Sequence, residues 1–105
     1  MEVSNISDLN LNDSEILQTF VTGSYEIEIH LKYVLDYASQ QFCAKKLVFQ
    51  DCLSAELQLN LAFQGPNSIL QASEVPAEEG HRTFTIETNT TARLITVTAK
   101  RLSLI

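Results

Sequence analysis

The chain has 105 residues, of which 45% are hydrophobic and 19% are charged, and its formal net charge is −6. This length suits one domain, residues 1–105, with one core, and the apolar content is too high for a disordered chain. Thirteen acids against seven bases exclude a surface for nucleic acid or anionic membrane, because both need clustered bases.

The first part of the chain predicts a loop followed by two strands. Residues 1–12 are rich in Ser, Asn and Asp, so we expect a loop-like N-terminal segment. A strand is expected at 15–22, and the turn Gly23-Ser24 leads into a second strand at 25–34. Apolar and polar side chains alternate along this second strand, which is typical of a strand with one buried face.

The middle of the chain predicts a third strand at 45–51 and then an ambiguous apolar run. Leucines alternate with polar residues from Leu57 onward, which favours a strand. Ser54 and the residues after it resemble a helix start, so a short helix near 54–62, and with it an α+β fold, is the alternative. A turn is expected at 64–68, followed by a short strand at 69–73.

The last part predicts an exposed acidic loop at 75–80 and a hairpin of strands at 82–88 and 92–99. Up to Ala99 the apolar residues occupy odd-numbered positions, but Leu102 and Leu104 occupy even ones. This change indicates either a bulge near Lys100 or a strand buried on both faces. No internal repeat is apparent. Together these elements predict an all-β fold, an antiparallel sandwich or open barrel of about seven to eight short strands.

The sequence lacks the patterns that catalysis or metal binding requires. The two histidines are His30, on the polar side of a strand, and His81, in a loop, and both are expected at the surface. No nucleophile elbow, paired Cys or His motif, or calcium loop occurs. We therefore predict that the protein is not an enzyme and uses no cofactor and no metal.

The N-terminal residues also indicate where the protein resides. They lack a basic stretch followed by an apolar one, so we expect no secretory signal and a cytoplasmic location. In that compartment Cys43 and Cys52 are expected to be free thiols. No apolar run is long enough to span a membrane.

Three short stretches resemble a known group of proteins. Residues 11–16 (Leu-Asn-Asp-Ser-Glu-Ile) resemble a signature of Leu-His-Asp-Ser, an acid and a branched apolar residue. Residues 47–52 resemble the central strand of the same proteins, and residues 64–69 resemble one of their turns. These are small bacterial β-rich proteins of the immunity-protein-50-like group from polymorphic-toxin systems. The resemblance implies an immunity protein that binds and neutralises a toxin, although Asn12 stands where that group has histidine.

The residues of this stretch also allow a purely structural interpretation. In that interpretation Asn12, Asp13 and Ser14 end the N-terminal loop, and the side chains of Asp13 and Ser14 bond nearby backbone N–H groups.

The distribution of charge predicts how such a protein would bind. The acids are concentrated before the first base, Lys32, and an acidic face accelerates association with a basic partner. The leading hypothesis is therefore a non-catalytic protein-binding module with a basic protein, such as a toxin domain, as its partner. The candidate protein-binding face comprises Asp13, Glu15, Glu26 and Glu28.

The alternative hypothesis is a small-ligand-binding or structural β-domain that acts as a homodimer, a larger homo-oligomer or an assembly subunit. The aromatic residues Tyr25, Tyr33 and Phe63 would then line a pocket or an interface.

Overall fold

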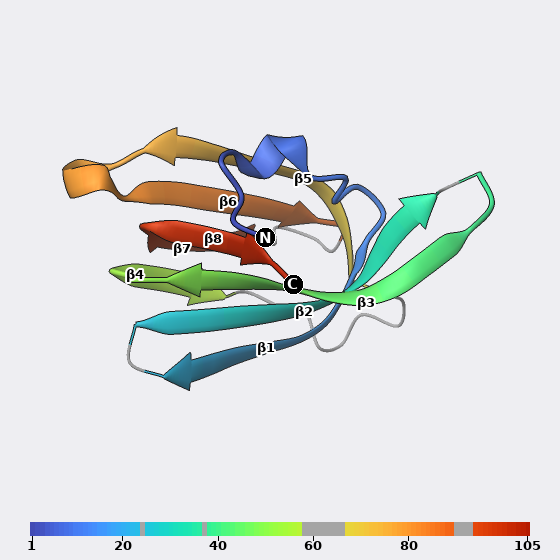
Figure 1. The fold of residues 1–105 in the computed structure, drawn as a ribbon, viewed down its shortest axis with the longest axis horizontal. Coiled ribbons are helices and arrows are strands. Elements are labelled where there is room, and N and C mark those ends of the chain that lie inside the picture. The colour runs from blue at the N-terminus through green and yellow to red at the C-terminus, as the bar shows by residue number, and fades with distance from the viewer. Residues whose placement is uncertain (24, 37, 58–66, 90–93) are drawn as a thin grey trace.

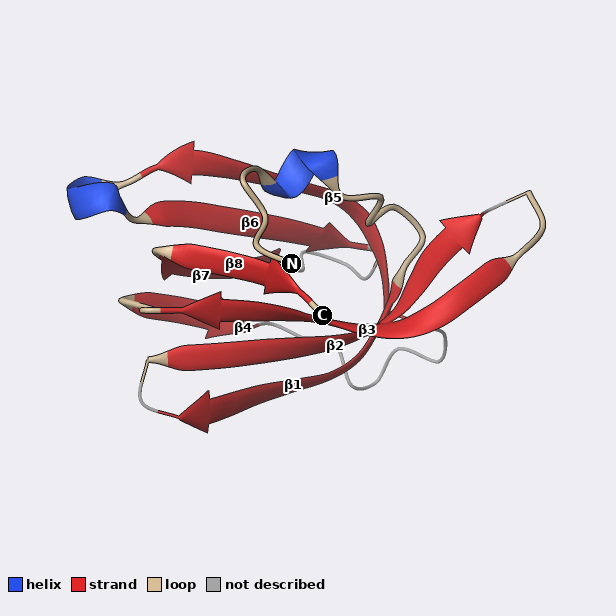
Figure 2. Cartoon of the chain, in the orientation of Figure 1, coloured by secondary structure: helices blue, strands red, loops and turns tan. Residues whose placement is uncertain are grey.

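The computed structural model describes residues 1–105 except 24, 37, 58–66 and 90–93 (Figure 1). The described residues form strands and two single-turn 3-10 helices, which confirms the all-β prediction (Figure 2). The elements are η1 (Ile6–Asp8), β1 (Glu15–Gly23), β2 (Glu26–Asp36), β3 (Gln41–Gln50), β4 (Ser54–Leu57), β5 (Asn67–Pro76), η2 (Glu78–Gly80), β6 (Arg82–Thr88), β7 (Leu94–Ala99) and β8 (Arg101–Leu104). No helix among the described residues is long and apolar enough to cross a membrane.

The strands form one antiparallel sheet that folds over on itself. Their order is β4-β7-β6-β5-β1-β2-β3-β8. The sheet bends where β1 meets β5, because only Glu15 and Ile16 of β1 are paired there, with Ser68 and Asn67. As a result the half β4-β7-β6-β5 lies against the half β1-β2-β3-β8, and the core fills the space between them (Figure 1).

Side chains from both halves meet in this core. Phe49 of β3 and Phe84 of β6 contact each other edge to face, with 5.2 Å between ring centroids. Burying an apolar side chain of this size contributes roughly 1.5–3 kcal/mol, so the two faces stabilise each other. The largest fully buried side chains include Ile29, Leu31, Leu47, Phe49, Ile69, Phe84, Ile86, Ile95, Val97 and Leu102.

The strand order has an internal two-fold symmetry. Exchanging β1–β4 with β5–β8 reproduces the sheet order read backwards. The exchange extends to single residues, because β1 and β5 each have a register shift at a leucine, Leu17 and Leu70. Each leucine lies between an isoleucine and a glutamine, and each is 53% exposed. The fold therefore consists of two structural repeats, β1–β4 and β5–β8, although no internal repeat was predicted from the sequence.

In both repeats the fourth strand pairs with the other repeat. β4 follows β3 in the chain but pairs with β7, and β8 follows β7 but pairs with β3. Equivalent backbone bonds fix the two crossings: the N–H of Leu53 donates to the carbonyl oxygen of Thr98, and that of Lys100 donates to Gln50, at 2.8 and 3.1 Å. The change from odd to even apolar positions after Ala99 therefore marks the point where the chain crosses from one half of the sheet to the other, and not a bulge.

Several strand boundaries differ from those predicted. β3 begins at Gln41 instead of residue 45, and β5 extends from Asn67 to Pro76. Residues 54–57 are a strand, so the helix alternative is wrong for them, whereas 58–62 lie outside the described residues. The same holds for residues 64–66 of the predicted turn.

The N-terminal segment contains no named strand, yet it is part of the core. Val3, Ile6 and Leu11 are buried. Residues 1–3 run along the outer edge of β8, where Glu2 bridges Ser103 and the N–H of Val3 donates to the Leu102 carbonyl oxygen at 2.7 Å. This pairing covers an edge that would otherwise offer unpaired backbone groups.

Candidate functional site

The polar residues of β2 gather on the outer face of the sheet. Because successive side chains of a strand point to opposite faces, burial of Ile29 in the core places Glu28 and His30 outside. Oε1 of Glu28 lies 2.9 Å from Nε2 of His30 and 3.5 Å from Nζ of Lys46 on β3. The ring of Phe20 contacts His30 edge to face, at 4.9 Å between centroids. Glu28 is thus the centre of a small charge cluster.

The environment of Glu28 keeps its carboxylate ionised. The hydrogen bond with His30 is the largest cause that lowers the pKa of Glu28 below its ordinary 4.5, and the charge of Lys46 acts in the same direction. Partial burial opposes both effects but does not outweigh them. A carboxyl group with a lowered pKa is a poor general acid at neutral pH, so the cluster does not have the protonation state of an acid catalyst.

The four predicted acidic residues do not form one patch. Glu15, Glu26 and Glu28 share the outer face of the β1–β2 pair. Glu15 lies opposite Lys32 in the register, however, and Glu26 precedes Lys32 by six positions, which is about 20 Å along β2. Asp13 lies before β1 in a left-handed turn with φ of 67°. Among the described residues, Glu28 is the only one of the four with an ion pair.

Ser14, next to Asp13, has a role that its sequence position does not reveal. Its side chain is fully buried, and its Oγ accepts a hydrogen bond at 3.2 Å from the backbone N–H of Val34. The donor is twenty positions away, on β2, and is not a neighbour in the turn. The hydroxyl therefore connects the start of β1 to the distal part of β2.

The two histidines differ in exposure. His30 lies at the surface with a side chain 36% exposed. The prediction for His81 is wrong, because this residue is only 7% exposed and its Nδ1 lies 2.9 Å from the carbonyl oxygen of Glu78. This contact joins the ring to the backbone of the short helix η2.

The aromatic residues named for the alternative hypothesis do not lie together. Tyr25 is 73% exposed, whereas Tyr33 packs against the core and its hydroxyl accepts a hydrogen bond from the N–H of Asn10. Phe63 lies outside the described residues.

The free-thiol prediction is confirmed for Cys43 and Cys52. No group of three or more His, Cys, Asp or Glu in the described part of the chain is arranged to hold a metal ion.

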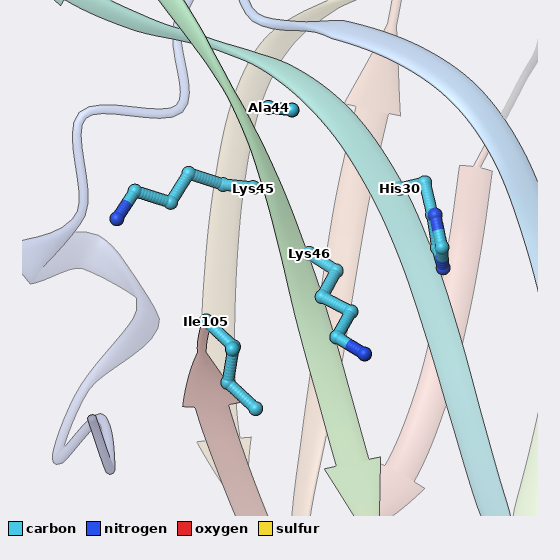
Figure 3. Close-up of a pocket in the computed structure, with 5 residues that line it drawn as sticks. All are labelled: His30, Ala44, Lys45, Lys46 and Ile105. Carbon is cyan, nitrogen blue, oxygen red and sulfur yellow. The ribbon is translucent and has the colours of Figure 1, made fainter.

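A shallow pocket of about 280 Å³ lies beside the charge cluster, at the point where β8 ends on β3 (Figure 3). Lys45 extends to one side of β3 and Lys46 to the other. Ile105 closes one end of the pocket and exchanges two backbone hydrogen bonds with Lys46, at 2.8 and 2.9 Å. The residues that line the pocket are His30, Ala44, Lys45, Lys46 and Ile105.

Beyond this pocket β2 and β3 continue as a two-stranded arm, residues 33–36 and 41–44, that projects from the sandwich (Figure 1). Leu35 and Phe42 of the arm are 55% and 40% exposed. The other repeat has no such arm in its strands, because β6 already ends at Thr88 and β7 begins at Leu94. Sequence reasoning missed the arm because its residues do not alternate regularly between apolar and polar.

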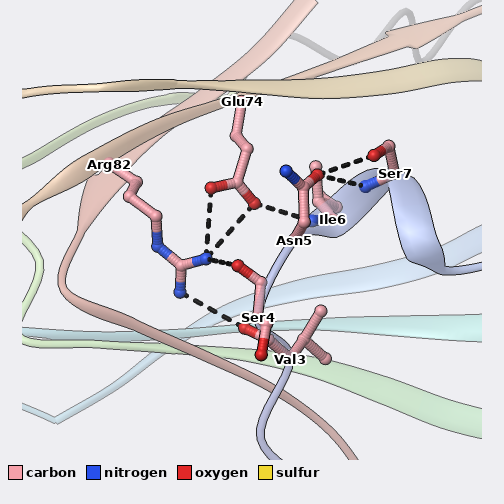
Figure 4. A network of polar contacts seen from close by, with 7 residues as sticks. All are labelled: Val3, Ser4, Asn5, Ile6, Ser7, Glu74 and Arg82. Carbon is pink, nitrogen blue, oxygen red and sulfur yellow. Dashed lines mark hydrogen bonds and ion pairs between the residues drawn. The ribbon is translucent and has the colours of Figure 1, made fainter.

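A second polar cluster fixes the N-terminal segment (Figure 4). Glu74 of β5 and Arg82 of β6 form an ion pair, and both side chains also bond the backbone of residues 3–6. The Arg82 guanidinium lies over the ring of Phe84, 4.9 Å from its centroid. The cluster thereby holds the N-terminal segment against β5 and β6.

Comparison of the chain with known protein families, with characterised proteins and with solved structures found no match.

Proposed function

We propose that the protein is a non-catalytic protein-binding module that contacts its partner with the β2–β3 arm. This proposal rests on one observation: the arm does not follow the internal symmetry that relates β1–β4 to β5–β8. The two repeats share strand order, bulges and crossing bonds, whereas among the described residues only β2 and β3 extend into an arm. A packed core explains the shared features, but it does not require a projecting ribbon with exposed Leu35 and Phe42.

The kind of partner follows from the resemblance described above. It implies that the module neutralises a toxin by covering it, and this is the specific form of the function that we propose. The net charge of −6 favours a partner that is basic overall. Exposed apolar side chains surrounded by polar ones are common at the centres of protein interfaces, so Leu35 and Phe42 would be the central contacts.

The test is capture of a partner from source-cell lysate with the tagged protein and two variants. One variant carries Leu35→Ser and Phe42→Ser, and the control carries Leu70→Ser, which changes a leucine of similar exposure outside the arm. We expect one stoichiometric protein with wild type and the control, and its loss with the arm variant. Equal capture by all three proteins would contradict binding through the arm.

Two further measurements identify the function itself. If the captured protein is a toxin, its expression alone should arrest growth, and co-expression of the wild-type module, but not the arm variant, should restore growth. Light scattering addresses the homo-oligomer alternative. A dimer that dissociates when Leu35 and Phe42 are replaced would identify a second copy of this chain as the partner instead.

A further inference from the structure

The arm has one strand edge whose backbone groups are available. In an antiparallel pair, residues that exchange both backbone bonds with the neighbouring strand recur at every second position. Lys46 exchanges both of its bonds with Ile105, so the N–H and C=O groups of Ala44 and Phe42 point to the same side of β3. No described residue pairs with them there, since β8 faces β3 only from Leu47 to Gln50. We call residues 42–45 the open β3 edge.

The open β3 edge is basic, although the molecule as a whole is acidic. Lys45 lies on it, Lys46 lies next to it, and Nζ of Lys32 lies 4.6 Å from the ring centroid of Phe42. Within the described residues, neither Lys32 nor Lys45 has a carboxylate within ion-pair distance. By contrast, Arg82 and Arg101 are both paired with acids. Of the three lysines in the described part of the chain that have no ion-pair partner, Lys32 and Lys45 lie beside this edge and Lys100 lies elsewhere.

We propose that the open β3 edge binds an extended, acidic segment of the partner protein as an added strand. The segment runs antiparallel to β3, in line with β8, and its backbone bonds Ala44 and Phe42. Its first side chain enters the pocket beside Ile105, where an acidic group meets Lys45, which extends to the same side of β3 as Ile105. Strand addition of this kind derives affinity from the backbone and specificity from alternate side chains. The inference rests on the proposed function and names the chemistry of the contact.

The test uses the full-length protein labelled with ¹⁵N and a synthetic peptide of about eight residues in which glutamate and valine alternate. We expect amide shifts and slower hydrogen exchange at Phe42 and Ala44 when the peptide is added. The same peptide with lysine in place of glutamate should produce neither effect. The inference would be overturned if the acidic peptide did not shift these two amides, or if the two peptides had equal effects.

Two variants separate the charge from the backbone contribution. Lys45→Glu should weaken binding of the acidic peptide by about fivefold, because an attraction becomes a repulsion. Its control, Lys100→Glu, makes the same charge change at the crossing between β7 and β8 and should leave the affinity unchanged. Ala44→Pro removes one donor on an edge where proline is tolerated, and it should abolish the slower exchange at Phe42. Identical affinities for wild type and Lys45→Glu would refute the role of the lysines.

The two proposals fail in different ways. If the arm variant loses its captured partner but the peptide does not affect Phe42 and Ala44, strand addition is wrong and the module still binds through the arm. If the peptide binds but capture does not depend on the arm, the proposed function is wrong and the edge binds a different segment.

Discussion

Arg82 and Glu74 form an ion pair at the end of the β5–β6 pair, with 3.1 Å between Nη1 and Oε2. Their side chains are only 19% and 8% exposed. Glu74 also accepts a hydrogen bond at 2.6 Å from the N–H of Ile6, and Arg82 donates to the carbonyl oxygens of Val3 and Ser4. The pair therefore connects two central strands to the N-terminal segment.

Glu74→Gln should lower the free energy of unfolding by about 2 kcal/mol, because Arg82 would keep a largely buried charge without its counterion. Urea unfolding measures the change. The matched control is Asp51→Asn, which breaks the 2.9 Å pair with Arg101, whose side chains are about half exposed. Exposed pairs contribute little, so the control should change stability by less than about 1 kcal/mol. Similar losses in the two variants would contradict the structural role of Glu74.

Ser14→Ala should lower the free energy of unfolding by about 1–2 kcal/mol, since it leaves the buried N–H of Val34 without its acceptor. Hydrogen exchange of the Val34 amide should become faster in the same variant. Ser39→Ala is the control, because Ser39 is exposed and bonds only Asp36 in the turn of the arm. If Val34 exchanged at the wild-type rate in Ser14→Ala, the assigned hydrogen bond would be wrong.

The lowered pKa of Glu28 has a consequence for stability that depends on pH. A carboxyl group whose folded-state pKa is depressed stabilises the fold above its unfolded-state pKa, and this contribution disappears as the pH falls through the folded-state value. The stability difference between wild type and Glu28→Gln should therefore be complete near pH 7 and vanish well below the ordinary pKa of 4.5.

Urea unfolding over this pH range measures the difference, and a ¹³C NMR titration reports the Glu28 pKa directly. His30→Ala removes the largest cause of the shift, so it should return the titration midpoint toward 4.5. An unchanged midpoint would show that Lys46 alone holds the carboxylate.

Burial raises the pKa of the Cys52 thiol above its ordinary 9.0. The thiolate is the reactive form, so iodoacetamide at neutral pH should label the partly exposed Cys43 first and Cys52 slowly. Peptide mass spectrometry measures the two rates, and Cys43→Ser provides the control for Cys52 alone. Since the folded-state pKa is raised, stability should also fall as the pH rises through 9.0. Rapid labelling of Cys52 in the folded Cys43→Ser protein would contradict its burial.

Alternation of side chains predicted the strands that bury one face. β2 shows this most clearly, because Ile27, Ile29 and Leu31 enter the core while the residues between them stay outside. The same alternation correctly placed Glu26 and Glu28 on one face. It could not predict that Lys46 lies beside Glu28, since this contact depends on the register between β2 and β3, which neither strand encodes alone.

Other features were missed because they depend on residues far apart in the chain. The polar N-terminal residues predict a loop, but Val3 and Ile6 are buried. Their backbone groups are held by hydrogen bonds with Glu74, Arg82 and β8. The internal symmetry left little trace in the sequence. Its clearest sign is the repeated Ile-Leu-Gln at 16–18 and 69–71, and three residues are too few to distinguish a repeat from coincidence.

The exchange of fourth strands determines when the chain can fold. β3 pairs with β8, and the backbone of residues 1–3 also bonds β8. The start of the chain therefore cannot complete its contacts until β8 has formed. Such distant pairings slow folding, typically to milliseconds or longer. During synthesis, β3 would therefore leave the ribosome with an unpaired edge, which remains exposed to aggregation and chaperones until residues 101–104 have emerged.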